Sequence, residues 1–248
     1  PGFGGPFIAD DLLYLEHNAA LSRPLGQALR TVTLDRYYVM GNWSPVHQLL
    51  LLAEWRAFGP NPLPYRVTNA LLHALVALAM VVAGRRIGLS RSAAFAAGTI
   101  FLVHPVAAEP VGWINQSKTL LAVGFALCAL DRWLAWLREP RPGRAVAATV
   151  LGALALLAKP AAIPLPAILL FAAWSHGRTV PLRRAALWLI PLAAIGTIAF
   201  ALGVDLPERG DREVYLATHF HHGGPAAALE GERDVGDGPE VRGHLLAD

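Results

Sequence analysis

Charged residues are scarce in this 248-residue sequence, where Asp, Glu, Lys and Arg together make up 16%. Soluble domains average about 25%. Hydrophobic residues make up 54% of the chain, and its mean hydropathy is +0.42. This composition argues against an ordinary soluble domain and is typical of an integral membrane protein.

Cysteine and lysine are also scarce. Cys128 is the one cysteine, so no intrachain disulfide can form. Among the 21 Lys and Arg residues only two are lysines, Lys118 and Lys159. Nucleotide-binding loops are missing, because neither GxGxxG nor GxxxxGKS/T occurs in the sequence. No internal repeat occurs either, which leaves long apolar runs as the organising feature.

The long apolar runs predict membrane-spanning helices, since about 20 apolar residues in a helix cross a bilayer core of about 30 Å. One helix over residues 145–174 would be about 45 Å long, and Lys159-Pro160 interrupts it, so we divide it into two. The six expected spans are 64–84, 93–108, 113–131, 145–158, 161–174 and 185–203. The predicted fold class is therefore all-α, a polytopic membrane helix bundle over residues 64–203.

The arginines predict the orientation of these spans. Three clusters fall in alternate loops: Arg85, Arg86 and Arg91; Arg138, Arg141 and Arg144; and Arg178, Arg183 and Arg184. Because Lys and Arg concentrate in cytoplasmic loops, we expect these three loops in the cytoplasm. Residues 1–63, loop 104–112 and the Lys159 hairpin then face the outside.

The segment 45–58 has a different interpretation, because it is too short to span a bilayer comfortably and contains His47 and Glu54. We expect an amphipathic helix that lies on the outer membrane surface, with Gly59 as its stop signal. The alternative is an additional span, which would invert residues 1–44.

The two ends of the sequence lack membrane-length runs. Residues 1–63 predict an external region that carries an acidic motif and the surface helix. Residues 204–248 are rich in Gly and charged residues, which predicts an external polar tail, disordered or truncated. Because the first residue is Pro1 rather than Met, we expect a piece of a longer protein.

Two adjacent carboxylates, Asp10 and Asp11, precede the membrane-length runs. Neighbouring carboxylates at a membrane interface repel each other, and partial burial raises at least one pKa. Such a group can act as a general base or bind a divalent cation, although we expect no metal or other cofactor to be required. The alternative is a solvated helix N-terminus with Asp as its cap. His219, His221 and His222 lack matching Cys or carboxylate spacing, so we predict no metal site there.

Polar side chains also mark the ends and faces of the spans. His104 and Glu109 lie at the outward end of one span, where ionisable groups are usually functional; the alternative is that they snorkel into water. Asn69 and His73 are four residues apart and share one helix face. All four residues are candidates for lining a cavity, although hydrogen bonds between helices are the simpler role for Asn69 and His73.

Lys118 and Lys159 both fall at outward-facing ends of predicted spans. A lysine at membrane depth costs about 2.5–3.5 kcal/mol on insertion scales. A phosphate partner offsets that cost, since ammonium is a good point-charge ligand for phosphate. Two such cations suit a lipid-linked phosphate, and simple contact with lipid headgroups is the alternative.

A series of short motifs resembles the membrane domain of the GT-C glycosyltransferases, nearest to the TMTC-type protein O-mannosyltransferases and their bacterial relatives that carry tetratricopeptide repeats. The resemblance covers about residues 7–175. Its motifs, in family order, are Phe7-Ile8-Ala9-Asp10-Asp11, Ser44-Pro45, Phe58-Gly59, Pro62-Leu63-Pro64-Tyr65-Arg66-Val67-Thr68-Asn69 with His73, His104-Pro105 with Glu109-Pro110-Val111, Ile114-Asn115-Gln116-Ser117-Lys118, and Leu157-Ala158-Lys159. Their order and spacing carry the likeness.

This resemblance implies an integral membrane glycosyltransferase that transfers a sugar, with inversion, from a polyprenyl-phosphate donor to an acceptor outside the cytoplasm. By that likeness Asp10 or Asp11 is the base that takes the acceptor proton, and Lys159 and Lys118 hold the donor phosphate. The missing nucleotide loops fit a lipid-linked donor. The acceptor is a protein hydroxyl or a lipid, and no nucleic-acid partner is expected.

The location implied is multi-pass in a bilayer, in a bacterial inner membrane with the active site facing outward. Two other functions stay open from the residues alone. A transporter or flippase for a lipid-linked sugar predicts charges along a membrane pathway or inverted repeats, and neither is visible in the sequence. A non-catalytic membrane anchor predicts that Asp10 and Asp11 can be replaced without effect.

Overall fold

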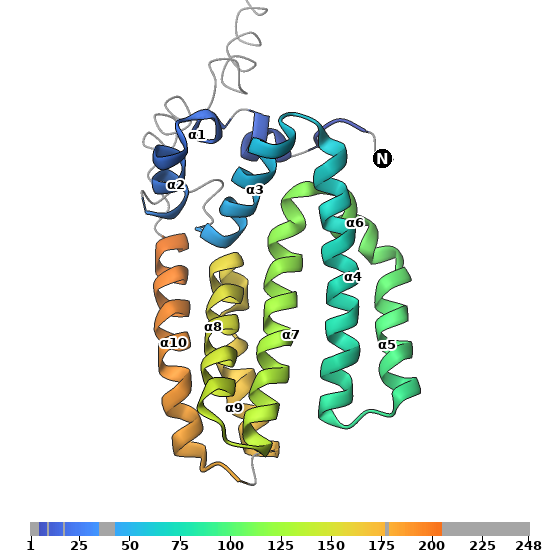
Figure 1. The fold of residues 1–248 in the computed structure, drawn as a ribbon, viewed down its shortest axis with the longest axis vertical. Helices are drawn as coiled ribbons and strands as arrows, with labels where there is room; N and C mark the ends of the chain where they lie inside the picture. Colours follow the sequence, from blue (N-terminus) through green and yellow to red (C-terminus); the bar gives the residue numbers. More distant parts are fainter. Residues whose placement is uncertain (1–4, 9, 17, 35–42, 177–178, 205–248) are drawn as a thin grey trace, which may run out of the picture.

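The computed structural model describes residues 5–8, 10–16, 18–34, 43–176 and 179–204. Within these ranges the regular elements are all helices, which confirms the predicted all-α class. Each of the six predicted spans overlaps one of the six long helices of the bundle. These helices lie side by side (Figure 1): α4 (Pro62–Ile87), α5 (Arg91–Val103), α7 (Ser117–Arg138), α8 (Pro142–Ala158), α9 (Leu165–His176) and α10 (Leu182–Val204).

Three helical stretches in the described residues are long and apolar enough to cross a bilayer: Pro62–Ile87, Ile114–Arg138 and Leu182–Ala201. A fourth passes the same test as a bent pair, Arg91–Val103 with Pro105–Gly112, with a bend of 53°. Helix α8 and the stretch Pro160–His176 are apolar but shorter. The chain therefore has the helices of an integral membrane protein, and the count of six crossings stays a prediction.

Local sequence signals explain where α4 begins and ends. Asn61 caps its start, since its side-chain oxygen accepts a hydrogen bond from the backbone N–H of Leu63 at 3.2 Å. Pro62 follows at the first helical position, where its missing N–H costs nothing. At the other end Gly88 has φ 107°, a left-handed conformation that favours glycine and stops the helix.

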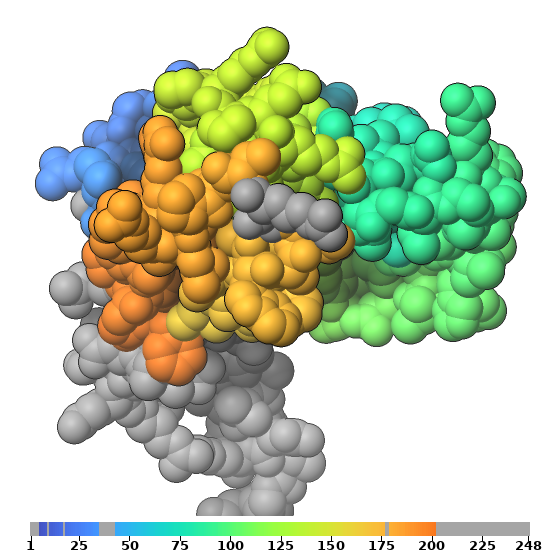
Figure 2. Space-filling model, turned by 90° about the horizontal axis from the view of Figure 1, so that it is seen from below, coloured from blue at the N-terminus to red at the C-terminus, as the bar shows by residue number. Residues whose placement is uncertain are grey.

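The bundle has two distinct ends (Figure 1). The arginine end, which we define as residues 85–91, 138–144 and 183–184, holds the loops after α4 and α7 and the start of α10. Arg178 lies outside the described residues. Seen from this end (Figure 2), α4 and α5 form one side of the molecule, and α9 and α10 form the other. The structure thus gathers the arginine clusters at one end, while their cytoplasmic location stays a prediction.

The opposite end, which we call the site end, is covered by the N-terminal segment and by short helices that join the long ones. They are η1 (Leu12–Glu16), α1 (Ala19–Ser22), α2 (Leu25–Thr33), α3 (Pro45–Phe58), η2 (Pro105–Ala107), α6 (Ala108–Gly112), η3 (Ile114–Gln116) and η4 (Pro160–Ala162). A separate apolar cluster joins them to the bundle, with Tyr14, Leu21, Leu51 and Tyr65 among its buried members. The N-terminal region therefore packs as a cap on the helices.

Helix α3 has the predicted bounds, but its two faces differ from the expected amphipathic pattern. The side chains of His47, Gln48 and Glu54 are buried together with Leu51, whereas Leu49 is exposed. The physical reason is that α3 packs against α7 and α8, so its polar face meets protein rather than water. Its position on a membrane surface stays a prediction. Within the predicted tail, residues 205–248 lie outside the described residues, including the histidines at 219, 221 and 222.

Candidate active site

The two carboxylates of the acidic motif are held by a loop about one hundred residues away. Trp113 donates its indole N–H to Asp10 Oδ1 at 2.7 Å, and Asn115 donates its side-chain amide to Asp10 Oδ2 at 2.5 Å. The backbone N–H of Asn115 donates to Asp11 Oδ1 at 2.9 Å, and that of Ile8 to Asp11 Oδ2 at 3.4 Å. The carboxylates therefore bind mainly to this loop.

The two carboxylates differ in burial. Asp11 has an exposed fraction of 0%, whereas Asp10 is half-buried. Burial raises the pKa of Asp11 to about 6, and the charge of Asp10 adds to this, while hydrogen bonds from Asn115 and Ile8 oppose it. The motif thus combines a half-buried carboxylate with a fully buried one whose pKa is raised toward neutrality.

Lys118 lies beside the acidic pair. Its Nζ sits 5.1 Å from the ring centroid of Tyr14, in the helix that follows the motif, which is a cation–π contact. Asp10 and Asp11 both attract this ammonium electrostatically. The structure therefore brings together three of the predicted site residues.

Lys159 joins the site end through a chain of hydrogen bonds. Its Nζ donates to Thr119 Oγ1 at 2.9 Å, the Thr119 hydroxyl donates to Gln116 Oε1 at 2.6 Å, and Gln116 donates to Glu109 Oε1 at 3.0 Å. Burial lowers the pKa of Lys159, and the carboxylate of Glu109 opposes that shift. The chain links two predicted site residues, Lys159 and Glu109, that are far apart in the sequence.

A hollow of about 270 Å³ opens next to Lys159, between α7 and α9. Apart from Lys159 and Thr119 its lining is apolar, with Val123, Leu165 and Ile168 among the side chains. Such a space suits a hydrocarbon chain whose charged end lies at Lys159.

Asn69 and Arg66, on one face of α4, fix the loop that holds the carboxylates. Asn69 Nδ2 donates to the carbonyls of Pro110, Trp113 and Ile114 at 3.1, 3.0 and 3.3 Å. Arg66 is fully buried and donates to the carbonyls of Gly112, Gly5 and Pro6. Asn69 is therefore a buried support for the Trp113 loop, the hydrogen-bonding role that the sequence analysis gave as the simpler one, and its role in lining a cavity stays a prediction.

The contacts of the two other predicted residues, His73 and His104, lie around the bend after α5. His73 Nε2 lies 3.3 Å from the carbonyl of Leu102, and its ring contacts Phe101 at 4.6 Å between centroids. His104 is exposed, and its Nδ1 accepts a hydrogen bond from the backbone N–H of Val106 at 3.2 Å. Both histidines stabilise the bend after α5, and their role in lining a cavity stays a prediction.

Sequence reasoning missed a buried polar face on α3. His47 has an exposed fraction of 0%, and its ring packs 5.8 Å from that of Tyr14 between centroids. Burial lowers the pKa of His47, and the charges of Lys118 and Lys159 lower it further. His47 is therefore a neutral side chain close to both lysines.

Several buried polar atoms near this face lack a hydrogen-bond partner among the described residues. They are Ser44 Oγ, both ring nitrogens of His47, both amide atoms of Gln48, Asn115 Oδ1 and Ser117 Oγ. Unpartnered buried polar atoms cost free energy and are uncommon in native proteins. The signal that could have revealed this face is the helical spacing of Ser44, His47 and Gln48, which puts them on one side of α3.

Within the described ranges, no group of three or more His, Cys, Asp or Glu side chains is arranged to hold a metal ion.

Comparison with known proteins gives one informative likeness. The chain is 29% identical over 132 residues to the protein O-mannosyl-transferase Tmtc1 of Drosophila melanogaster. The aligned part is 50% of this chain and 15% of the fly protein, so the chain spans a small part of that relative. No family model matches the chain, and no solved structure matches it. The likeness supports a TMTC-like relationship for about half of the chain.

Proposed function

We propose that this chain is part of an integral membrane glycosyltransferase that moves a sugar from a polyprenyl-phosphate donor to a hydroxyl outside the cytoplasm. One observation carries the proposal: Asp10 and Asp11 lie beside Lys118 at the same end of the bundle as Lys159, opposite the arginine end. A carboxylate base and cations for a leaving phosphate are the groups that such a transfer needs.

Asp10 is the proposed general base. It is half-buried and so within reach of an acceptor, whereas Asp11 is sealed. The acceptor hydroxyl gives its proton to Asp10, and its oxygen attacks the anomeric carbon. The bond from that carbon to the phosphate oxygen breaks, and the polyprenyl phosphate leaves with the electron pair. A single displacement of this kind inverts the anomeric configuration.

The lysines are the proposed partners of the donor phosphate. Lys159 lies where a polar chain of hydrogen bonds meets the apolar hollow between α7 and α9. A polyprenyl phosphate has the same division, with an anionic head and a hydrocarbon tail. Lys118 neutralises the growing charge on the leaving phosphate from the side of the acidic pair.

The name of the similar fly protein makes a protein hydroxyl the first acceptor to test and mannose the first sugar. A lipid acceptor fits the same chemistry. Lipid-linked sugar transport and a non-catalytic anchor are the competing functions. Both predict that the wild type and a variant with an amide in place of a carboxylate show the same sugar transfer, or that neither shows any.

The test is sugar transfer in proteoliposomes that contain the 248-residue chain, with a panel of polyprenyl-phosphate sugars and peptide acceptors. Asp10→Asn should lower transfer about 100-fold or more, since a general base is worth about 10²–10⁴-fold in rate. Glu16→Gln is the matched control, because Glu16 is an exposed carboxylate on the neighbouring helix η1. A loss below about tenfold for Asp10→Asn would refute its role as the base.

A further inference from the structure

A second and larger hollow lies away from the acidic pair, along α4 and α7. Its volume is about 590 Å³. Its lining is Leu72, Leu75, Val76, Leu78, Ala79 and Val82 of α4; Leu120, Leu121, Gly124, Phe125, Leu127, Cys128, Asp131 and Arg132 of α7; and Leu151 of α8. Apart from Asp131 and Arg132 the lining is apolar. We call this hollow the α4–α7 groove.

Gly124 keeps the groove open where α7 passes α4. A Cβ atom at this position would meet Val76 Cγ2 at 3.5 Å, an ordinary contact, so a larger side chain would fill the groove rather than collide with backbone. Leu75 and Leu78 are about 60% exposed along the same stretch of α4. The groove therefore opens toward the surroundings of the bundle.

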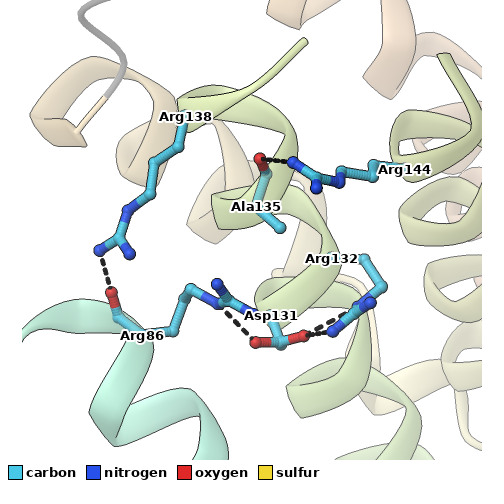
Figure 3. A network of polar contacts seen from close by, with 6 residues as sticks. All are labelled: Arg86, Asp131, Arg132, Ala135, Arg138 and Arg144. Carbon is cyan, nitrogen blue, oxygen red and sulfur yellow. Dashed lines mark hydrogen bonds and ion pairs between the residues drawn. The ribbon is translucent and has the colours of Figure 1, made fainter. Parts of the chain in front are cut away.

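One end of the groove carries an excess of positive charge (Figure 3). Asp131 is buried and accepts hydrogen bonds from Arg86 Nε at 2.7 Å and from Arg132 Nε at 2.8 Å. Arg138 donates to the backbone carbonyl of Arg86 at 2.5 Å, which ties α7 to α4 at this end. Two guanidinium groups thus share one carboxylate.

Both guanidinium groups keep the capacity to bind a further anion. The side chains of Arg132 and Arg86 are 45% and 31% exposed. A guanidinium has five N–H donors, and Arg132 uses only its Nε and Nη2 groups on Asp131. An anionic group at the end of the groove would therefore meet the positive charge of both guanidinium groups and N–H donors that Asp131 does not use.

The length of the groove fits one membrane leaflet. From Arg132 to Leu120 α7 rises about 18 Å at 1.5 Å per residue, and half of a bilayer core is about 15 Å. The charge-free run of α7 is interrupted at Asp131, which meets Arg86 at the end of α4, so we place the charged end of the groove near the membrane boundary on the arginine side. The groove thus begins at the headgroups of that leaflet and passes just beyond the midplane.

We propose that the α4–α7 groove binds a glycerophospholipid of the leaflet at the arginine end, with an anionic headgroup at Arg132 and Arg86 and one acyl chain along Leu75 and Gly124. The lipid fills an apolar space between two helices and neutralises the surplus charge beside Asp131. Anionic lipids are enriched in the cytoplasmic leaflet, where the arginine clusters are predicted to lie. This site does not depend on the glycosyltransferase proposal.

The test is native mass spectrometry of the 248-residue chain in detergent, titrated with phosphatidylglycerol, phosphatidylcholine of the same chains, and polyprenyl phosphate. Phosphatidylglycerol should bind about tenfold more tightly than phosphatidylcholine, the difference expected for one charge-assisted interaction. Arg132→Gln should remove that preference, and Gly124→Leu should weaken both phospholipids. Arg141→Gln is the matched control, because Arg141 is 74% exposed at the same end but does not line the groove.

Three results would overturn the proposal. Equal affinity for the two phospholipids would remove the role of the headgroup charge. An equal loss in Arg141→Gln and Arg132→Gln would indicate diffuse attraction to the arginine end. Displacement of phosphatidylglycerol by an equimolar amount of polyprenyl phosphate would assign the groove to a sugar donor. If Gly124→Leu does not fold, the smaller Gly124→Ala and the comparison of the arginine variants decide the question.

Discussion

Asn115 contacts both members of the acidic motif, since its side-chain amide donates to Asp10 at 2.5 Å and its backbone N–H donates to Asp11 at 2.9 Å. A single residue thus sets the spacing of two carboxylates that lie more than one hundred positions earlier in the chain. Mutation of Asn115 can therefore remove the side-chain hydrogen bond to Asp10 but not the backbone hydrogen bond to Asp11.

Asn115→Ala should lower sugar transfer about tenfold while leaving the fold intact. The substitution removes the hydrogen bond that the side-chain amide donates to Asp10, and a hydrogen bond to a charged group contributes about 1.5–3 kcal/mol. The backbone bond to Asp11 remains. Transfer rates and helix content by circular dichroism check this prediction, with Gln27→Ala on the exposed face of α2 as control. Equal rates in both variants would contradict it.

The stability of the chain should depend on pH through Asp11. Burial raises its folded-state pKa to about 6, from an ordinary value of 3.8. The folded state therefore holds this proton more tightly than the unfolded state, so stability is greatest below about pH 4 and is lost as pH rises to about 6. The change amounts to at most about 3 kcal/mol.

Thermal unfolding in detergent between pH 4 and 7, for the wild type and Asp11→Asn, measures this contribution as a difference. The difference is needed because burial also raises the pKa of Glu54, to about 7, which adds a second dependence in the same direction. If the two proteins lose stability in parallel over this range, Asp11 is ionised in the folded state and the prediction is wrong.

His47→Leu should raise the stability of the chain. Both ring nitrogens of His47 are buried without a partner among the described residues. Replacing such a group with an apolar one of similar size removes a cost of about 1–3 kcal/mol. Chemical denaturation in detergent gives the stability, and Gln27→Leu, on the surface, is the control. A destabilised His47→Leu would mean that the ring has a partner in the folded protein.

Lys159→Gln should raise the KM for the polyprenyl-phosphate donor more than it lowers kcat, because the proposed role of Lys159 is to bind the donor phosphate in the ground state. Thr119→Val is the matched control, since it breaks the hydrogen bond to Lys159 but keeps the charge. An unchanged donor KM in Lys159→Gln would remove this lysine from the donor site.

Glu109 and Arg141 should label from opposite sides of the membrane. Each is replaced by cysteine in a Cys128→Ser background and treated with a membrane-impermeant maleimide in oriented vesicles. Both positions are exposed, one at the site end and the other at the arginine end. Labelling of both from the same side would overturn the predicted orientation.

Much of the fold was predictable because its signals are local. Pro45 and Gly59 mark the two ends of α3, and Gly59 has φ 60°, a backbone angle that favours glycine. The end of α7 was not predictable in the same way. The charge-free run stops at Asp131, yet the helix continues to Arg138, because Trp133, Trp136 and Leu137 beyond it are buried in the core. Arg86 and Arg132 pair with the carboxylate that interrupts the run.

The site was predictable in its charged residues but not in their partners. Asp10, Asp11 and the lysines were visible because ionisable groups are rare in this sequence. The choice of Trp113 and Asn115 as partners depends on how α4 and α7 meet, which no spacing along the chain encodes. The inward direction of His47 depends likewise on the packing of α3 against the bundle.

Arg66 and Asn69 fasten the loop under the acidic motif to α4, while Lys118 belongs to α7. Trp113 and Asn115, which hold both carboxylates, lead directly into the start of α7, so the separation of acid and cation is set within one short stretch of the chain. Helices of this length respond to bilayer thickness by changing their tilt. Because the acidic motif and Lys118 are both attached to the start of α7, the distance between them should stay the same in membranes of different thickness.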